Sequence, residues 1–466
     1  MLKKRFLLCV LSLILLVSPV QIYADTTAAT DLAVTNGCHS VDGAIPFLGQ
    51  DRLVENAQSV IMFETGSQTL MYAWNADTPM YPASLVKIMT ALLVLEKGTL
   101  TDEVTVNQSA LNTVSSDAIS VELQAGEIIT VENLMYCMMV YSANDAAAVL
   151  AEYISGSQNE FVALMNTKAE ELGCNGTTFT NPHGLHNELQ LTTARDMCRI
   201  LQAALEYDVF RTIFGTVTYT VPATNLQDQR SISTNNYLMN TAAVAIHYDG
   251  RVTGGRSGVT AEGFRCVASV SESGNMELIC IVMGAKSVYS ENTTNISSYG
   301  GFPETSKLLD MAYDGYARKQ IIYENQILRQ QPVLNGDNDV FAASYEAFST
   351  VLPTDISFDQ LSFRYADAPG SNQAPIKKGQ NLAALQVWYG GMCVAQTDIF
   401  AMNDVPVAYV KSAVPDAGAS SGSGWIVIMI VVILVLLAAI ALFLLRSAAI
   451  MKHRAKHRHR NRRRRH

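Results

Sequence analysis

The stretch Tyr81-Pro82-Ala83-Ser84-Leu85-Val86-Lys87-Ile88-Met89 decides how the rest of the chain is interpreted. Proline can begin a helix but cannot continue one, and apolar residues recur at helical spacing from Leu85 to Leu93. Ser84 therefore falls in the first turn of a buried helix, and Lys87 lies on the same face one turn later. A lysine can take the proton of a serine when burial and nearby positive charge keep it neutral. The helix N-terminus supplies part of that positive field.

Two further motifs follow, Tyr141-Ser142-Ala143-Asn144-Asp145 and Gly254-Gly255-Arg256-Ser257-Gly258-Val259-Thr260. A lone Ser-x-x-Lys arises by chance about once or twice in a chain of this length. The three motifs together, in this order, resemble the Ser-x-x-Lys, Ser-x-Asn and Lys-Thr/Ser-Gly set of penicillin-binding proteins and serine β-lactamases. Arg256 departs from that set, which usually has lysine. Arginine keeps the positive charge, but it is larger and does not lose its proton.

The segment between the second and third motifs indicates which of these protein families the chain resembles more. An amphipathic helix from Phe161 to Gly173 is followed by a turn that contains Asn181-Pro182-His183-Gly184-Leu185, and Thr192-Thr193 opens the next helix. This stretch is similar to the D-alanyl-D-alanine carboxypeptidases, which are low-molecular-mass penicillin-binding proteins, more than to the β-lactamases. His183 could be a catalytic base, but its place in a Pro-Gly turn favours a structural role.

The resemblance covers roughly Ser40 to Val410 and implies both a fold and a set of roles. The implied fold is an α/β-type (α+β) penicillin-recognising domain, an antiparallel sheet flanked by helices, followed by a small all-β domain. Ser84 would be the acyl-ester nucleophile and Lys87 its proton acceptor. Ser142 would relay a proton to the leaving amine, while Asn144 would orient the Lys87 ammonium and the substrate amide.

The third motif would bind the substrate. Arg256 would place positive charge near Lys87 and the substrate carboxylate, Ser257 would hydrogen-bond that carboxylate, and Gly258 belongs to the same substrate-binding strand. The backbone N–H groups of Ser84 and Val259 would form the oxyanion hole. The resemblance implies no metal and no cofactor.

The sequence pattern predicts where these motifs lie. Residues 59–64 and 69–74 form a predicted β-hairpin that leads into the Ser84 helix, and residues 251–258, 264–272 and 276–285 form a predicted antiparallel meander. Ser142 falls on a loop between two helical patterns, which suits a side chain that points into a cleft.

The two ends of the chain predict export and anchoring. Residues 1–24 resemble a signal peptide, with a membrane anchor as the alternative, and a polar leader covers 25–44. The apolar run of 21 residues from Trp425 to Leu445 matches the hydrocarbon thickness of a bilayer and predicts one C-terminal transmembrane helix, after a flexible linker at 411–424. The basic tail at 446–466 predicts a cytoplasmic C-terminus. We therefore expect a single-pass protein of the bacterial cell membrane, with its catalytic domain extracytoplasmic.

The charge distribution excludes one class of partner. Of the 33 Lys and Arg residues, 13 lie in the first five or the last 21 residues, whereas all 42 Asp and Glu residues lie between. The intervening body therefore carries a net charge of −22 and is not expected to bind nucleic acid. Its scattered cysteines predict buried thiols, with a bridge between Cys266 and Cys280 as an open alternative.

These observations predict a catalytic domain at 45–318 and a β domain at 320–410. The expected function is a serine-type D-alanyl-D-alanine carboxypeptidase that trims the terminal D-alanine from peptidoglycan stem peptides in cell-wall synthesis, with β-lactam antibiotics as covalent inhibitors. A β-lactamase or D,D-endopeptidase of the same mechanistic class is one alternative, although the Asn-Pro-His-Gly-Leu segment and the β domain disfavour the β-lactamase. The other alternative is a wall-binding protein without turnover, which only Arg256 favours.

Overall fold

The computed structural model describes residues 48–49, 51–242, 245–289, 296–409, 428–443 and 445–446. The expected signal peptide, polar leader and linker lie outside these residues, as does the basic tail beyond Arg446. The chain divides into two compact units between Val407 and Ala408. In the second unit, residues 428–443 are helical. No helix among the described residues combines the length and the apolar character needed to cross a membrane.

A five-stranded antiparallel sheet forms the centre of the first domain, in the strand order β2-β1-β9-β8-β7. These strands are β1 (Ser59–Glu64), β2 (Thr69–Trp74), β7 (Val252–Val259), β8 (Arg265–Ser273) and β9 (Met276–Ala285). The pairing of β1 with β2 confirms the predicted hairpin, and the pairing of β7, β8 and β9 confirms the predicted meander. The strand that carries the third motif, β7, therefore lies at one edge of the sheet.

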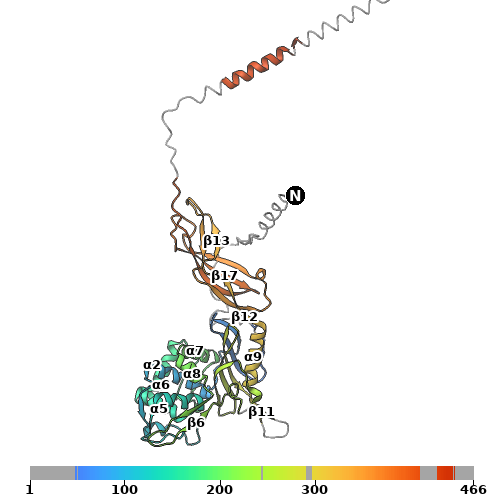
Figure 1. Ribbon diagram of the computed structural model, residues 1–466. Helices are drawn as coiled ribbons and strands as arrows, with labels where there is room; N and C mark the ends of the chain where they lie inside the picture. The colour runs from blue at the N-terminus through green and yellow to red at the C-terminus, as the bar shows by residue number, and fades with distance from the viewer. Residues whose placement is uncertain are drawn as a thin grey trace, which may run out of the picture. The chain divides into compact units, whose positions relative to one another are not determined.

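Helices cover both faces of this sheet, as Figure 1 shows, with α9 on one side and the other long helices on the opposite side. The helices are α2 (Val86–Lys97), α3 (Gln108–Leu111), α4 (Val131–Tyr136), α5 (Asn144–Ser155), α6 (Gln158–Glu171), α7 (Ala194–Leu205), α8 (Asp208–Phe214) and α9 (Phe302–Gly315). Short helical turns are η1 (Ala83–Leu85), η2 (Cys137–Tyr141) and η3 (Ala245–His247). This arrangement is the α+β fold that the sequence predicted.

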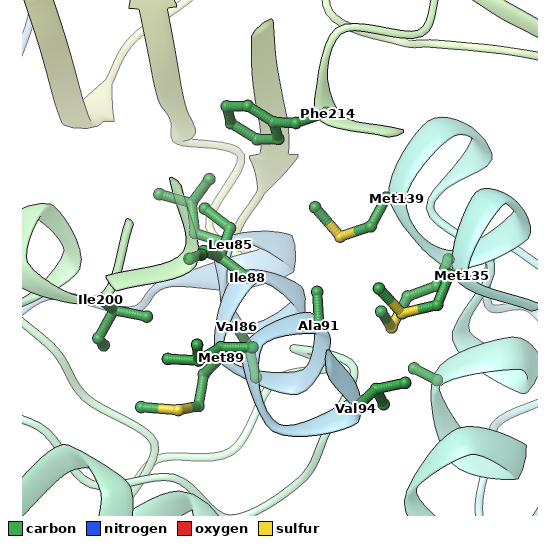
Figure 2. Close-up of a cluster of buried hydrophobic side chains, with 14 of the residues drawn as sticks. Leu85, Val86, Ile88, Met89, Ala91, Val94, Met135, Met139, Ile200 and Phe214 are labelled. Carbon is green, nitrogen blue, oxygen red and sulfur yellow. The ribbon is translucent and has the colours of Figure 1, made fainter. Parts of the chain in front are cut away.

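Alternate residues of each strand enter two different cores, as expected for a sheet covered on both faces. Ile61 and Phe63 of β1 pack with α2 and its neighbouring helices, whereas Val60 and Met62 pack on the α9 side. Figure 2 shows the first core around α2, which carries buried side chains on every side. A helix held in this way has little freedom to move, so the residues of its first turn are fixed in place.

Three pairs of short strands complete the part of the first domain that the structure describes. They are β3 (Glu103–Thr105) with β4 (Ile128–Thr130), β5 (Thr218–Val221) with β6 (Arg230–Ser233), and β10 (Val288–Tyr289) with β11 (Ile296–Ser298).

The second domain follows the first within the unit that ends at Val407, and it is built of strands. It contains β12 (Tyr316–Ile322), β13 (Ile327–Gln331), β14 (Val340–Ala343), β15 (Phe348–Pro353), β16 (Ser362–Asp367), β17 (Asn381–Tyr389) and β18 (Met392–Ala401), with the short turn η4 (Phe358–Gln360). One sheet has the order β13-β14-β18-β17-β16, and β12 pairs with β15 in a second. The small all-β domain expected after the catalytic domain is therefore present.

Buried thiols were the expectation for Cys266 and Cys280, and the open alternative of a bridge between them is wrong. Both residues are buried free cysteines. The register explains the error, because Cys280 lies opposite Ser269 on β8, three residues away from Cys266.

Candidate active site

Ser84 lies in η1, the single turn that joins Pro82 to α2. The residue before it, Ala83, has a φ of 48°, a left-handed conformation that is unfavourable for a residue with a side chain. Gly184 packs against this turn. If Gly184 carried a Cβ atom, that atom would lie 2.0 Å from the Ala83 carbonyl oxygen. Only glycine permits this close approach, so the Asn-Pro-His-Gly-Leu segment packs directly against the backbone of the candidate nucleophile.

Lys87 follows one turn later and is completely buried. Its Nζ atom lies 3.4 Å from Ser84 Oγ and 2.8 Å from Asn144 Oδ1, and it also contacts the backbone oxygen of His183. Burial lowers the pKa of Lys87 well below its usual value, the charge of Arg256 lowers it further, and Asp145 opposes both effects. This downward shift favours the neutral amine, which is the form of lysine that can accept a proton.

Ser142 directly follows η2, a turn of π-helix, and has a φ of 76° and a ψ of 24°. This left-handed conformation places its Oγ atom 3.0 Å from Ser84 Oγ. Ser142 lies between two helical segments, as the sequence predicted, and it is buried. π-Helical turns are rare and occur often at functional sites.

Asn144 and Asp145 begin α5, and both form hydrogen bonds with the loop at 119–123. The Asn144 amide nitrogens of both backbone and side chain donate to the Ile119 carbonyl, at 2.8 and 2.9 Å. The Asp145 carboxylate is buried and accepts hydrogen bonds from the Ser120 hydroxyl and from the backbone nitrogens of Val121 and Leu123. The loop at 119–123 is therefore held in place beside Asn144 and Asp145.

Strand β7 brings the third motif beside Ser84. Gly258 lies so close that a Cβ atom on it would stand 2.5 Å from the Ser84 backbone nitrogen. Val259 ends the strand and is half exposed, whereas Ser257 is buried and its hydroxyl donates to Asn235. Arg256 is 1% exposed, and its Nη1 atom donates to the Met139 carbonyl at 2.7 Å.

His183 does not present a titrating ring to the site. Burial and the Lys87 charge lower the pKa of His183 to about 3, and its Nδ1 atom accepts a hydrogen bond from the Leu185 backbone nitrogen at 3.2 Å. The ring is therefore neutral at physiological pH. Its backbone carbonyl is the group that contacts Lys87.

The structure brings together Ser84, Lys87, Ser142, Asn144 and the strand from Arg256 to Val259, all the residues that the sequence singled out for the site. Backbone acceptors at Met139 and His183, and the buried carboxylate of Asp145, were not expected. Backbone carbonyls carry no sequence signal, but the acidic residue directly after the Ser-x-Asn motif could have been noticed.

A serine flanked by a buried lysine and a second hydroxyl can be acylated, because one neighbour accepts its proton and the other passes a proton to the departing group. On an antiparallel sheet flanked by helices, this arrangement defines a serine enzyme of the penicillin-recognising class. Residues 50–287 match the family model described as "D-alanyl-D-alanine carboxypeptidase", and residues 316–407 match "Penicillin-binding protein 5, C-terminal domain". The chain belongs to the D-alanyl-D-alanine carboxypeptidase family and is a serine peptidase.

Individual relatives agree with this assignment. The chain is 29% identical to D-alanyl-D-alanine carboxypeptidase DacF of Bacillus subtilis over 366 residues, which cover 76% of this chain and 87% of that protein. It is 31% identical to DacC of Escherichia coli, with 75% of this chain and 84% of that protein covered. The structure also superposes on the crystal structure of penicillin-binding protein 5 from Haemophilus influenzae with a TM-score of 0.62, over 77% of this chain and all of that one. The two sequences are 27% identical. The family and enzyme class predicted from the three motifs are confirmed.

Proposed function

We propose that this protein removes the terminal D-alanine from peptidoglycan stem pentapeptides through an acyl-enzyme at Ser84. The observation that carries the proposal is the buried Lys87 Nζ atom at 3.4 Å from Ser84 Oγ, with Ser142 Oγ at 3.0 Å on the same hydroxyl. The names of the family model and of the relatives supply the substrate class.

In the acylation step, neutral Lys87 takes the Ser84 proton as Oγ attacks the carbonyl carbon of the penultimate D-alanine. The backbone N–H groups of Ser84 and Val259 stabilise the developing oxyanion. Ser142 passes its proton to the nitrogen of the terminal D-alanine as the peptide bond breaks, and the proton held by Lys87 is passed back to Ser142, so that both groups regain their starting states. Asn144 keeps Lys87 oriented, and the positive charge of Arg256 and the Ser257 hydroxyl favour a substrate that ends in a carboxylate.

In the second step, water attacks the Ser84 ester, releases the shortened peptide and returns the proton to Ser84. A β-lactam follows the same first step, but its leaving nitrogen stays attached to the acyl group after ring opening. We therefore infer that penicillins bind covalently at Ser84 and hydrolyse slowly.

The direct test is mass spectrometry of a D-Ala-D-Ala-terminated pentapeptide incubated with the purified chain. The proposal predicts a tetrapeptide product and one free D-alanine. Cleavage of a cross-linked dimer peptide without release of D-alanine would favour the D,D-endopeptidase, and rapid turnover of penicillin would favour the β-lactamase. Binding of the peptide without any product would favour the wall-binding protein.

We further propose that the protein is held in a bacterial cell membrane by the apolar segment Trp425–Leu445, with the catalytic domain outside and the basic tail in the cytoplasm. The 21-residue apolar run and the ten Lys and Arg residues after it support this topology. A signal peptide at residues 1–24 would direct the export, and the catalytic and β domains would cover 45–318 and 320–410.

A further inference from the structure

The backbone of Ser142 is held in a costly conformation. A residue with a side chain pays of order 1–2 kcal/mol to adopt the left-handed region, and Ser142 has a φ of 76°. Such a conformation persists only where several contacts with the surrounding structure hold it in place. Two of the restraints lie after Ser142, where both nitrogens of Asn144 donate to the Ile119 carbonyl. The chain before Ser142 must also be held for this backbone conformation to persist.

The carbonyl of Met139, three residues before Ser142, lacks its usual helical partners. In a helix, this oxygen would accept from the backbone nitrogen of Ser142, Ala143 or Asn144, depending on the type of turn. Ser142 and Ala143 instead donate to Cys137, and Asn144 donates to Ile119. The π-helical turn thus leaves the Met139 oxygen without those donors. A buried carbonyl without a donor costs about 1–3 kcal/mol.

Arg256 supplies the missing donor. Its Nη1 atom lies 2.7 Å from the Met139 oxygen, and this hydrogen bond joins β7 to the turn before Ser142. The Met139 side chain enters the apolar cluster around α2, as Figure 2 shows, so this residue is held at both its side chain and its carbonyl. The Nε and Nη2 atoms of Arg256 are buried and have no partner.

The charge of Arg256 is a separate property. Burial lowers the pKa of Arg256 to about 9, which leaves the guanidinium protonated at neutral pH. Its charge contributes to the low pKa of Lys87, whereas its hydrogen bond to Met139 acts on Ser142. Lysine at this position would keep the charge, but its ammonium lies one bond nearer the backbone than the Nη1 atom of arginine, so it falls short of the Met139 oxygen.

We propose that Arg256 is a positioning residue that fastens the π-helical turn to strand β7 and so holds Ser142 against Ser84. An arginine rather than a lysine stands at this position because the Met139 carbonyl needs a donor at that distance. The catalytic consequence of this fastening depends on the function proposed above, whereas the fastening itself does not.

Two variants separate the hydrogen bond from the charge. In Arg256→Lys the charge stays and the bond to Met139 is lost, so we expect the second-order rate of acylation by a fluorescent penicillin to fall by about 10- to 100-fold. The pH at half-maximal rate stays that of the unmodified protein. In Arg256→Ala the rate falls further, and this pH rises because Lys87 regains a higher pKa. Full activity in Arg256→Lys would overturn the proposal, as would a rise of the pH midpoint in that variant.

Arg265→Lys is the matched control. Arg265 begins β8 directly opposite Val259, but its guanidinium packs on Tyr299 and Phe302 rather than on Met139. The control should acylate at the rate of the unmodified protein. A loss in Arg265→Lys as large as that in Arg256→Lys would mean that replacing any arginine of this sheet impairs the site, and the proposal would fall.

Hydrogen exchange tests the fastening without catalysis. Amides of residues 139–144 should exchange faster in Arg256→Lys and Arg256→Ala than in the unmodified protein, while those of α6 keep their rates. Unchanged exchange at 139–144 would contradict the proposal. If the unmodified protein takes up no penicillin, the proposed function fails, and exchange alone still decides whether Arg256 holds the turn.

Discussion

Lys87 Nζ lies 2.8 Å from Asn144 Oδ1, and this contact joins the first motif to the second across 57 residues of sequence. The neutral amide oxygen orients the amine without adding a full negative charge. The pKa of Lys87 therefore stays low through burial and through the Arg256 charge. Lys87 can therefore act as a base because position 144 carries an amide and not a carboxylate, which would raise the pKa of Lys87.

Replacement of that amide by a carboxylate should disable the base. In Asn144→Asp, a negative charge beside the Lys87 ammonium raises the pKa of Lys87, so less of the neutral form exists at pH 7. We expect acylation at pH 7 to fall by on the order of 100-fold, the scale of disturbing one preorganised electrostatic group, and the rate to recover as the pH is raised. The measurement is the rate of penicillin acylation against pH. Asn275→Asp, in the exposed β8–β9 turn, is the control, and identical pH profiles for the two variants would refute this explanation.

A methyl group at position 258 should block the site. In Gly258→Ala the new Cβ atom would stand 2.5 Å from the Ser84 nitrogen and 3.0 Å from Ser84 Cβ. Strand β7 or the Ser84 turn must therefore move, and a displacement of this kind costs about 100-fold in rate. The control is Gly315→Ala, where a Cβ atom meets nothing within 4 Å. Acylation of the Gly258→Ala variant at the unmodified rate would show that the close approach of β7 to Ser84 is not needed for the reaction.

Removal of one buried ion-pair partner should affect stability. Glu127 is fully buried, and Arg230 Nη2 lies 2.7 Å from its Oε1 atom. Arg230→Ala leaves the carboxylate without its counter-charge and should lower the free energy of unfolding by about 3–5 kcal/mol. Asp77→Ala breaks the more exposed pair with Arg195 and should cost less than about 1 kcal/mol. Urea unfolding of both variants is the measurement, and equal losses would disprove the difference attributed to burial.

Removal of the apolar C-terminal segment should separate anchoring from catalysis. A chain that ends at Ala417 keeps both domains that the family models match, so we expect it to fold, remain in the aqueous phase and acylate at the full rate. The measurement is partition between membrane and soluble fractions, together with penicillin labelling. A truncated chain that still sediments with membranes would refute anchoring by Trp425–Leu445.

The sequence predicted those parts of the site that depend on local periodicity. Ser84 and Lys87 are one helical turn apart, and Ser142 falls where one helical pattern stops and the next begins, so local rules placed both motifs correctly. The meander that carries Arg256 was equally clear, because its turns and alternating strands are local features.

Contacts that depend on three-dimensional packing could not be predicted. The Met139 carbonyl becomes an acceptor only because the turn before Ser142 is π-helical, and the His183 carbonyl reaches Lys87 only because Gly184 packs on Ala83. The possible bridge between Cys266 and Cys280 failed for a similar reason, since pairing of β8 with β9 depends on a register that the hairpin sequence does not specify.

The most direct test of the account is mass spectrometry of the protein after reaction with penicillin. We predict one covalent adduct with the full mass of the drug, located on Ser84 by digestion and absent from Ser84→Ala. The same preparation, before penicillin is added, should release D-alanine from the pentapeptide and should stop doing so once the adduct has formed. An adduct that persists in Ser84→Ala, or one located on another residue, would contradict the assignment of Ser84 as the nucleophile.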